Sequence, residues 1–378
     1  MSHFEMDSTS TLTTRGTERE RHSSNDPTPA ILPTSSNGEQ KRAARHSPTP
    51  DKISAKEVML RLSEPVAAEL MEVEIRLGRE LQSPHDELTG VLQHGTQIGG
   101  KRLRPALVLL TGTAVGPLSN DHVVLGTVVE MVHTATLIHD DVLDDAETRR
   151  HVATINARWD EHTSILVGDY LFAQSFRLAA TLKSTEACRL VGEAARLVCE
   201  GELRQVLSRD ILSISEKDYF SMIRGKTAEL CRVACELGAK YSGGSSGIAE
   251  AMGQYGDSLG VAFQIADDFL DLWGHDATVG KTLGTDIRQG KMTLPLIRLR
   301  DTVSRAQWQH ISQILTGPVE ERLPAIMPFL EQSDARSYTQ HVAESFKRRA
   351  IKSLDCIPCS EARHSLSQLA SFSVDRSF

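Results

Sequence analysis

The sequence has no hydrophobic run long enough to cross a membrane, and it is poor in the residues that favour β-sheets. No apolar stretch approaches the roughly 20 residues of a membrane-spanning helix, so we expect no transmembrane segment. Aromatic residues make up only 5% of the 378 residues, and runs of β-branched residues are sparse. Hydrophobic residues make up 40%, which is enough for a large core. The composition therefore favours an all-α protein.

The sequence also lacks an excess of basic charge and a disulfide framework. The net charge of −8 argues against nucleic acid as the main partner. The six cysteines are scattered, which is typical of a reducing compartment. Cys356 and Cys359 form one C-x₂-C pair with no second pair at zinc spacing. A structural zinc needs four ligands, so we expect no cysteine metal site.

The first 50 residues contain almost no large apolar side chains. They are rich in Ser, Thr and Pro, so they cannot bury enough surface to fold, and we predict a disordered N-terminal tail over residues 1–52. A secretory signal is excluded because there is no apolar core segment. Arg15 and Arg19 would suit a mitochondrial transit peptide, but Glu18 and Glu20 would not. We expect a cytoplasmic protein, with the mitochondrion as the alternative if the tail is cleaved.

Residues 53–378 show a helical pattern almost throughout and are predicted to form one domain. Apolar residues recur at i, i+3, i+4 and i+7 in segments 55–81, 121–145, 162–182, 186–208, 216–240 and 247–273. Residues that favour helix ends occur at Gly99-Gly100, Gly116-Pro117, Gly168, Ser213–Ser215 and Ser242–Gly247. Long helices joined by short connections predict an antiparallel helical bundle.

Two clusters of aspartates follow long apolar segments. Residues 137–145 read LIHDDVLDD, and residues 264–271 read QIADDFLD, so the spacing D-D-x-x-D occurs twice. Asp140 and Asp144 lie four apart and share one helix face, where like charges destabilise an isolated helix by a few tenths of a kcal/mol. A single cluster could be a solvated helix end. Two such clusters in an all-α chain indicate that a cation meets them.

The chemistry of these clusters favours Mg²⁺. Oxygen ligands without nearby cysteines select a hard cation. Mg²⁺ keeps several waters and usually binds through one or two carboxylates together with substrate phosphates. Two facing aspartate clusters would hold a diphosphate between them through bridging Mg²⁺, which neutralises the charge of the leaving group.

Basic residues occur where a diphosphate would need them. Three cations, Lys101, Arg102 and Arg104, follow a glycine pair at the start of a helical segment, where free N–H groups favour anions. Arg149 and Arg150 follow the first aspartate cluster, Lys281 and Lys291 follow the second, and Lys226 lies inside a helical segment. Together they indicate two anion sites, one bridged by metal and one held by side chains alone.

From about residue 53 onward, the chain resembles the trans-polyprenyl diphosphate synthase family. The motifs that carry the resemblance are GGKRLRP, HTATLIHDDVLDD, RR, GDYLFAQ, GKTAEL, QIADDFLD, GK and DIRQGK. The resemblance implies an isoprenoid-synthase-type bundle of antiparallel helices around a central cavity. It implies repeated head-to-tail condensation of isopentenyl diphosphate with an allylic diphosphate such as farnesyl or geranyl diphosphate. It also implies about three Mg²⁺ ions and a homodimer formed through helices near the first aspartate cluster.

The resemblance implies roles for individual residues. The implied metal ligands are Asp140 and Asp144 from one helix and Asp267 from the facing helix, with Asp141, Asp268 and Asp271 binding directly or through water. The residues implied to hold isopentenyl diphosphate are Lys101, Arg104, His133 and Arg150. Those implied to hold the allylic diphosphate are Arg149, Lys226, Gln264 and Lys281. Thr227 and the Lys226 carbonyl region are implied to stabilise the developing allylic cation.

The sequence departs from the family pattern after the arginine pair. The family often has R-R-G-x-P-T, whereas this chain has His151 and Ala153 at the glycine and proline positions. The change alters the stiffness of the loop without removing a charge.

Two small residues precede the first aspartate cluster. In the family, bulky aromatics four and five residues before the first aspartate close the pocket at short products. Here these positions are Thr136 and Ala135. Thr136 lies one turn below Asp140 on the same face, about 6 Å along the helix axis. We therefore predict a long product, about hexaprenyl to decaprenyl and preferably octaprenyl, of the kind used for quinone side chains.

Four other functions remain as alternatives. His139 and Asp140 form the H-D pair of some metal-dependent phosphohydrolases, but that class needs more histidine ligands. A terpene cyclase would share the aspartate clusters but would not need Lys101 and Arg104. A shorter-chain geranylgeranyl synthase would differ only in product length. A non-catalytic subunit of a heteromeric synthase tends to lose aspartates, and here both motifs are complete.

Overall fold

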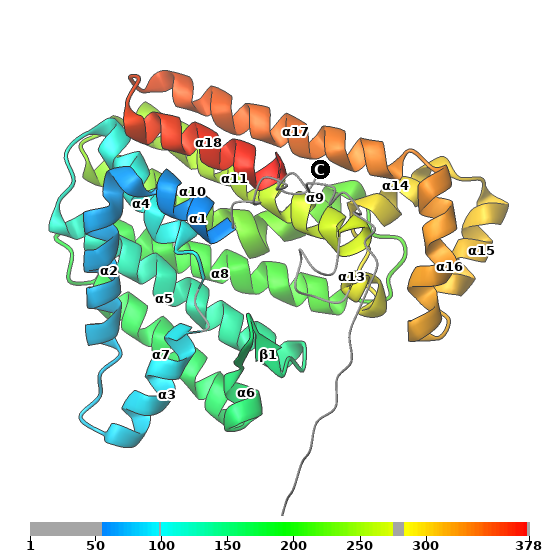
Figure 1. Ribbon diagram of the computed structural model, residues 1–378, viewed down its shortest axis with the longest axis horizontal. Helices are drawn as coiled ribbons and strands as arrows, with labels where there is room; N and C mark the ends of the chain where they lie inside the picture. The colour runs from blue at the N-terminus through cyan, green and yellow to red at the C-terminus, as the bar shows by residue number, and fades with distance from the viewer. Residues whose placement is uncertain (1–54, 98–99, 275–282, 376–378) are drawn as a thin grey trace, which may run out of the picture. The chain divides into compact units, whose positions relative to one another are not determined.

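The computed structural model describes residues 55–97, 100–274 and 283–375, and these residues are almost entirely helical (Figure 1). The predicted all-α class is confirmed. The predicted tail over residues 1–52 and the predicted ligand Lys281 lie outside the described residues.

The helices and strands follow one another along the chain in this order. The first part contains α1 (Ala55–Leu62), the 3₁₀ turn η1 (Glu64–Val66), α2 (Ala67–Glu80), α3 (Asp86–Gln97), α4 (Leu103–Val115), α5 (Asn120–Leu143), β1 (Thr148–Arg149), β2 (Val152–Ala153) and α6 (Ile155–Arg158). The middle contains α7 (Glu161–Ala179), α8 (Glu186–Leu207), α9 (Glu216–Ile223), the π-helical turn η2 (Arg224–Ala228), α10 (Glu229–Tyr241) and α11 (Ser246–Trp273). The last part contains α13 (Thr285–Arg288), α14 (Leu294–Thr302), α15 (Arg305–Leu315), α16 (Val319–Gln332), α17 (Ala335–Ser353), η3 (Leu354–Cys356) and α18 (Glu361–Asp375).

Helices α5 and α11 lie inside the bundle and carry the two aspartate clusters at their C-terminal ends. Helix α5 packs against α4 and α7, and α11 packs against α10 and α17 (Figure 1). Buried residues occur on all sides of both helices, as expected for central helices. The N-terminus of α5 is fixed by a capping box of Ser119 and His122, and the N-terminus of α11 is capped by Ser245. Both helices therefore present their last turns at defined positions.

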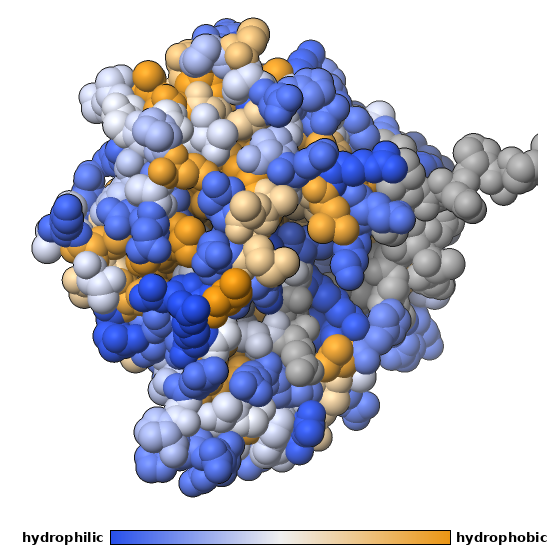
Figure 2. All heavy atoms as spheres, turned by 60° about the vertical axis from the view of Figure 1, so that its left-hand side comes forward, coloured by the Kyte–Doolittle hydropathy of each residue, from blue (hydrophilic) through white to orange (hydrophobic). Residues whose placement is uncertain are grey.

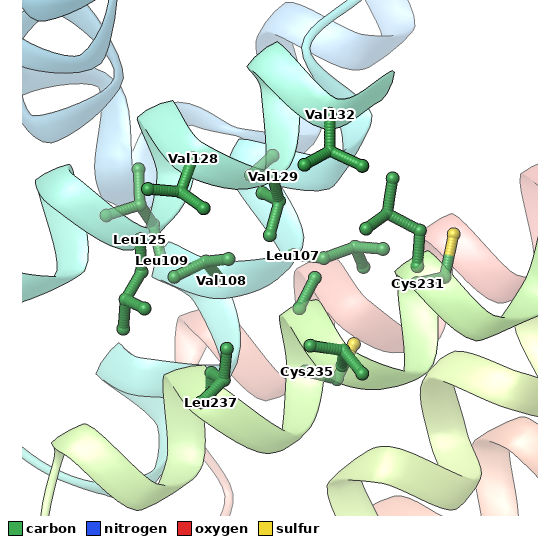
Figure 3. Close-up of a cluster of buried hydrophobic side chains, with 14 of the residues drawn as sticks. Leu107, Val108, Leu109, Leu125, Val128, Val129, Val132, Cys231, Cys235 and Leu237 are labelled. Carbon is green, nitrogen blue, oxygen red and sulfur yellow. The ribbon is translucent and has the colours of Figure 1, made fainter. Parts of the chain in front are cut away.

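Part of the core lies where α4, α5 and α10 meet. Leu107 and Leu109 of α4 and Val128 of α5 are fully buried there, facing Cys235 and Leu237 of α10 (Figure 3). On the surface shown in Figure 2, hydrophobic residues lie in several groups with hydrophilic residues between them. Burial of this kind is the main favourable term in folding, at about 25 cal/mol per Å² of apolar surface.

Helices α4 and α10 pack so closely at Gly238 that one added methyl group should lower the stability of the protein. A Cβ on Gly238 would overlap the Val108 carbonyl and the Thr111 hydroxyl. We expect Gly238→Ala to lower the free energy of unfolding by about 1–3 kcal/mol, because α10 must move away from α4. The matched control is Gly78→Ala in α2, where a Cβ would meet nothing within 4 Å. This variant should stabilise the protein by about 0.4–1 kcal/mol. Urea unfolding measures both values, and equal effects would contradict this account of the contact.

Three predictions about helix boundaries were wrong. The segment 55–81 is not one helix, because Pro65 removes a backbone donor and the chain forms η1 between α1 and α2. Gly168 does not end a helix but lies inside α7, where its missing side chain leaves room for the His139 ring. The segment 216–240 is interrupted by the π-helical turn η2, which contains Lys226 and Thr227.

Candidate active site

Lys226 lies between the two aspartate clusters. Its charge interacts with Asp140 and Asp144 at the end of α5. It also lines a pocket with Tyr219, Gln264, Asp268, Asp286 and Lys291. The structure therefore brings the first cluster, the second cluster and the predicted diphosphate ligand Lys226 into one region, as the sequence predicted.

Asp140 is a carboxylate of the first cluster whose pKa is strongly raised. Burial raises its pKa to about 6, the nearby Lys226 opposes this rise, and Glu202 and Asp144 add to it. The protein therefore holds a buried carboxylate at a cost in stability, as functional sites often do. A cation at this position would relieve that cost.

Asp141 has a different environment from Asp140. It is only 1% exposed, and one of its carboxylate oxygens accepts a hydrogen bond of 2.7 Å from Nε of Arg149. The resemblance implied a metal role for Asp141, but the structure shows it fixing Arg149, a predicted ligand of the allylic diphosphate. Asp145 lies beyond the end of α5, is exposed and has a positive φ of 48°, so it is a solvated charge at the end of the helix.

This difference among the aspartates leads to a stability prediction. We expect Asp141→Asn to lower the free energy of unfolding by about 1.5–3 kcal/mol, because it removes a charge-assisted hydrogen bond from a buried site. Asp145→Asn should change it by less than about 0.5 kcal/mol, as is usual for exposed residues. Urea denaturation of the two variants checks this. Equal stabilities would show that the Asp141–Arg149 contact contributes nothing.

Asp144 is the carboxylate of the first cluster that reaches toward the second. Its Oδ1 accepts a hydrogen bond of 3.1 Å from Nε2 of Gln289 and lies 3.6 Å from the guanidinium of Arg209 at the end of α8. Gln289 directly follows α13. The segment after the second cluster is thus tied directly to the first cluster.

Asp271 holds the start of α13. Its two carboxylate oxygens each accept a hydrogen bond of 3.0 Å, from the backbone N–H groups of Thr285 and Asp286. Burial and the neighbouring Asp286 raise the pKa of Asp271 to about 6. Asp271, predicted as a metal ligand, therefore also positions Asp286, a further carboxylate to which sequence reasoning assigned no role.

Asp268 is the most deeply buried member of the second cluster. It is 4% exposed, and burial together with the charge of Asp286 raises its pKa to about 8. It accepts hydrogen bonds from the Tyr219 hydroxyl at 2.6 Å and from Nε2 of Gln264 at 2.8 Å. Asp267, one position earlier, is half-buried.

The π-helical turn η2 is held by small residues on its neighbours. A Cβ on Gly201 of α8 would lie 2.6 Å from the backbone nitrogen of Lys226, and a Cβ on Gly260 of α11 would lie 2.5 Å from Cα of Ala228. The backbones of α8 and α11 therefore approach η2 closely from two sides. π-Helical turns of this kind occur frequently at functional sites, and here the turn carries Lys226 and Thr227.

The side chain of Lys226 is held by α8. Its ammonium group forms an ion pair of 2.5 Å with Glu202 and donates a hydrogen bond of 2.9 Å to Gln205. Although burial opposes it, the pKa of Lys226 is raised by Asp140 and Glu202. The lysine is therefore a fixed positive charge. Glu202 and Gln205 were missed at the sequence level because they look like ordinary polar positions of an amphipathic helix.

A second group of basic residues surrounds His133. Burial lowers the pKa of His133 well below its usual value, and Arg104 and Arg150 lower it further, so the imidazole is neutral. Among the described residues, the buried Nε of Arg104 has no hydrogen-bond partner. A side chain on Gly100 would overlap the Arg150 guanidinium, so Gly100 lies directly against Arg150. The structure thus joins Arg104, His133 and Arg150, as predicted for an anion site held by side chains.

Lys101 and Arg102 differ although they are adjacent. Arg102 is paired with Glu74 of α2 and with Glu130 of α5, the latter at 2.9 Å. It is therefore a structural residue, whereas Lys101 is exposed. The assignment of Lys101, and not Arg102, to the isopentenyl diphosphate site stays a prediction.

The arginine pair lies on a β-hairpin. Strands β1 and β2 are antiparallel, and Arg150 and His151 between them have positive φ angles of 53° and 66°. This backbone is typical of two-residue hairpin turns and favours glycine, so His151 is strained where the family often has glycine. The base of the hairpin is held by Nε2 of His94, 2.7 Å from the Ala153 carbonyl oxygen.

The predicted product wall lies one turn before Asp140. Ala135 is fully buried in the core, and Thr136 is half-buried, with its hydroxyl donating to the His133 carbonyl at 2.7 Å. His139 instead contacts α7, where its Nε2 lies 3.1 Å from the Ile165 carbonyl oxygen. Its ring is therefore not beside Asp140 as a shared metal ligand, which argues against the phosphohydrolase alternative.

The donors of the site suit Mg²⁺ that arrives with phosphate oxygens. Among the residues that the structure describes, no group of three or more His, Cys, Asp or Glu side chains is gathered tightly enough to hold a metal ion alone. Burial is the main cause of the raised pKa values of Asp140, Asp268 and Asp271, and neighbouring carboxylates add to it. Buried oxygen donors that do not hold an ion by themselves fit Mg²⁺ that is completed by water and substrate phosphates.

Comparisons with known proteins agree with this geometry. Residues 85–326 match the model of the polyprenyl synthetase family. The chain is 33% identical over 283 residues to the octaprenyl diphosphate synthase of Haemophilus influenzae, covering 75% of this chain and 86% of that protein. The crystal structure of a decaprenyl diphosphate synthase from Rhodobacter capsulatus superimposes with a TM-score of 0.80 at 34% identity, covering 85% of this chain and 99% of that one. This chain belongs to the polyprenyl synthetase family, whose members are trans-prenyltransferases.

Other relatives differ in what their names state. A polyprenyl synthase from Caulobacter crescentus, crystallised with calcium and isoprenyl diphosphate, superimposes with a TM-score of 0.77 at 33% identity, covering 87% of this chain and 100% of that one. A protein from Methanothermobacter thermautotrophicus named as a short chain isoprenyl diphosphate synthase is 34% identical over 288 residues, covering 75% of this chain and 89% of that protein. Membership of the family therefore establishes the reaction class but not the product length.

Proposed function

We propose that this protein is a Mg²⁺-dependent synthase of long-chain all-trans polyprenyl diphosphates. The observation that carries the proposal is the position of Lys226 between Asp140 and the second aspartate cluster, with a separate group of Arg104, His133 and Arg150 nearby. One region combines several carboxylates with a fixed cation, whereas the other is dominated by arginines around a neutral histidine, with Glu130 as a nearby carboxylate. This arrangement suits two diphosphates, only one of which ionises.

The residues would divide the chemistry as follows. Asp140, Asp144, Asp267 and Asp271 would hold Mg²⁺, which supplies charge neutralisation to the departing diphosphate. The allylic diphosphate would be bound by Arg149, Lys226 and Gln264. Lys281, which lies outside the described residues, would bind it as well. Lys101, Arg104, His133 and Arg150 would bind isopentenyl diphosphate.

The reaction would proceed without a dedicated side-chain base. The C1–O bond of the allylic substrate breaks, and the C4 alkene carbon of isopentenyl diphosphate forms a bond to C1. A proton then leaves C2 of the isopentenyl unit to the released pyrophosphate. Thr227 and the Lys226 carbonyl would stabilise the cation while charge develops, which lowers the barrier through preorganised dipoles.

A long product, preferably octaprenyl, is supported by the small side chains at Ala135 and Thr136 and by relatives named as octaprenyl and decaprenyl diphosphate synthases. The relative named as a short-chain synthase keeps a geranylgeranyl product as the second candidate. Incubation with Mg²⁺, labelled isopentenyl diphosphate and farnesyl diphosphate tests both. We expect products of about 30 to 50 carbons; a series ending at 20 would overturn the chain length, and no elongation would overturn the proposed activity.

We further propose a homodimer formed through α7 and α8. Leu166 of α7 is 67% exposed, and Leu203 and Leu207 of α8, one turn apart, are 62% and 75% exposed. Large exposed apolar side chains that share a face often mark protein interfaces. A relative from Bacillus subtilis is named as component 2 of a heptaprenyl diphosphate synthase, so a second, different chain is the alternative. Light scattering of the purified chain distinguishes a dimer of about twice 41.6 kDa from a monomer.

The structure contains no described helix long and apolar enough to cross a membrane. A cytoplasmic location stays a prediction, with the mitochondrion as its alternative, and fractionation of cells that express the full chain tests it.

A further inference from the structure

Tyr219 is a buried polar residue that the proposed chemistry does not use. It lies on α9, is 3% exposed, and its hydroxyl donates a hydrogen bond of 2.6 Å to Oδ2 of Asp268 on α11. Burial and the neighbouring Asp268 raise the pKa of Tyr219 well above its usual value. The hydroxyl therefore keeps its proton and acts as a donor.

The hydrogen bond from Tyr219 to Asp268 is the first of three hydrogen bonds that connect Tyr219 to Thr227. The other oxygen of Asp268, Oδ1, accepts a hydrogen bond of 2.8 Å from Nε2 of Gln264. Oε1 of Gln264 in turn accepts a hydrogen bond of 2.7 Å from the Thr227 hydroxyl. This chain of hydrogen bonds thus runs from a buried tyrosine to the π-helical turn, where Thr227 is half-buried beside Lys226.

The direction of these hydrogen bonds follows from the chemistry of their members. The Tyr219 hydroxyl donates to Oδ2 of Asp268, and the Gln264 NH₂ group, which can only donate, lies at Oδ1. Because Asp268 accepts from both Tyr219 and Gln264, the amide of Gln264 must turn its NH₂ group toward Asp268 and its oxygen toward Thr227.

The orientation of Gln264 fixes the single proton of the Thr227 hydroxyl. A hydroxyl has one O–H to donate and two lone pairs. When Gln264 presents its oxygen, Thr227 donates its proton there and retains lone pairs for the site. If Gln264 rotated its amide by half a turn, Thr227 would accept from it and present its proton instead. A lone pair stabilises a neighbouring carbocation, whereas an O–H dipole pointing at it does not.

We propose that Tyr219 is a positioning residue that, through Asp268 and Gln264, makes Thr227 present lone pairs to the developing allylic cation. This inference rests on the proposed function, because it assigns Tyr219 a part in the ionisation step. Tyr219 touches neither substrate in this scheme and acts entirely through the orientation of the other side chains. Its hydroxyl should therefore matter for the rate of ionisation and not for the binding of isopentenyl diphosphate.

The test is a double-mutant cycle on the first condensation, measured as a single turnover with farnesyl diphosphate, isopentenyl diphosphate and Mg²⁺. We expect Tyr219→Phe to slow this step about tenfold, the size of one hydrogen bond to a charged group. The KM for isopentenyl diphosphate should change less than about twofold. In a Thr227→Val background, Tyr219→Phe should have almost no further effect, because residues that act as a unit are not additive. In a Thr227→Ser background, which keeps the hydroxyl, the tenfold effect should return.

The matched control is Tyr255→Phe. Tyr255 is also fully buried, and its hydroxyl donates 2.7 Å to the Leu366 carbonyl, so the variant loses a comparable bond outside the chain of hydrogen bonds. It should leave the single-turnover rate unchanged. Additive effects of Tyr219→Phe and Thr227→Val, or an equal slowing by Tyr255→Phe, would overturn the inference while leaving the proposed function intact. A wild-type protein that forms no product would overturn the proposed function itself.

Discussion

Asp140→Asn is expected to reduce prenyltransferase activity at least about 10²-fold while making the protein more stable. The activity falls because the proposed site loses a carboxylate that would hold Mg²⁺ against the departing diphosphate, and loss of one such stabilising group commonly costs 10²–10³ in kcat. The stability rises because the charge of Asp140 is unfavourable in the folded protein, where burial raises its pKa to about 6.

The stability effect has a defined pH dependence. The folded state binds the proton of Asp140 more tightly than the unfolded chain, so the stability of the wild type falls as pH rises from about 4 to about 6. Because the pKa of Asp140 lies about two units above its usual value, the effect on the free energy of unfolding is at most about 3 kcal/mol. Urea unfolding without Mg²⁺ should show Asp140→Asn to be more stable than the wild type at pH 7 by up to this amount. The difference should disappear near pH 4.

The matched control for activity is Asp145→Asn. Asp145 belongs to the same run of four aspartates, but it is exposed beyond the end of α5. Its substitution should leave activity within about twofold of the wild type, because Asp145 is exposed and forms no ion pair with another residue that the structure describes. If Asp140→Asn kept most of the activity, or if Asp145→Asn lost it, the assignment of the metal ligands from α5 would be wrong.

Much of the helical framework could be predicted from the sequence. The apolar periodicity of segments 121–145, 186–208 and 247–273 matches α5, α8 and α11 within a few residues, because long central helices carry strong patterns. The break at Pro65 was missed because a proline at the start of a helical turn and one inside a helix look alike in sequence. The π-helical turn was missed because it depends on close contacts of Gly201 and Gly260, which lie far from it in sequence.

The charged part of the site could also be predicted, but its internal connections could not. The repeated D-D-x-x-D spacing locates Asp140, Asp144 and Asp267 directly. The positions of Asp141 and Asp268, in contrast, depend on partners many residues away: Arg149 on a hairpin and Tyr219 on α9. A buried tyrosine in an amphipathic helix looks like a core residue, so only the three-dimensional structure reveals that it donates to an aspartate of the motif.

Thr136→Phe is expected to shift the product from a long chain to about 20 carbons or fewer. Thr136 lies on the face of Asp140, about 6 Å below it along α5, and it is half-buried, so an aromatic ring there would stand in the path of a chain whose diphosphate is held at Asp140. Ala135→Phe should shorten the product as well. Because Ala135 is fully enclosed, this second variant should also lose about 1–3 kcal/mol of stability through overpacking.

Chain-length analysis of the products by reversed-phase chromatography, together with urea unfolding, separates the two effects. The matched control is Thr163→Phe, at a half-buried threonine in the first turn of α7 and not on the helix that carries Asp140. It adds the same bulk and should leave the product length unchanged. An unaltered long product from both Thr136→Phe and Ala135→Phe would show that this wall does not limit the chain. The limit would then lie deeper in the bundle, where side chains from other helices would have to stop a chain that passes α5 freely.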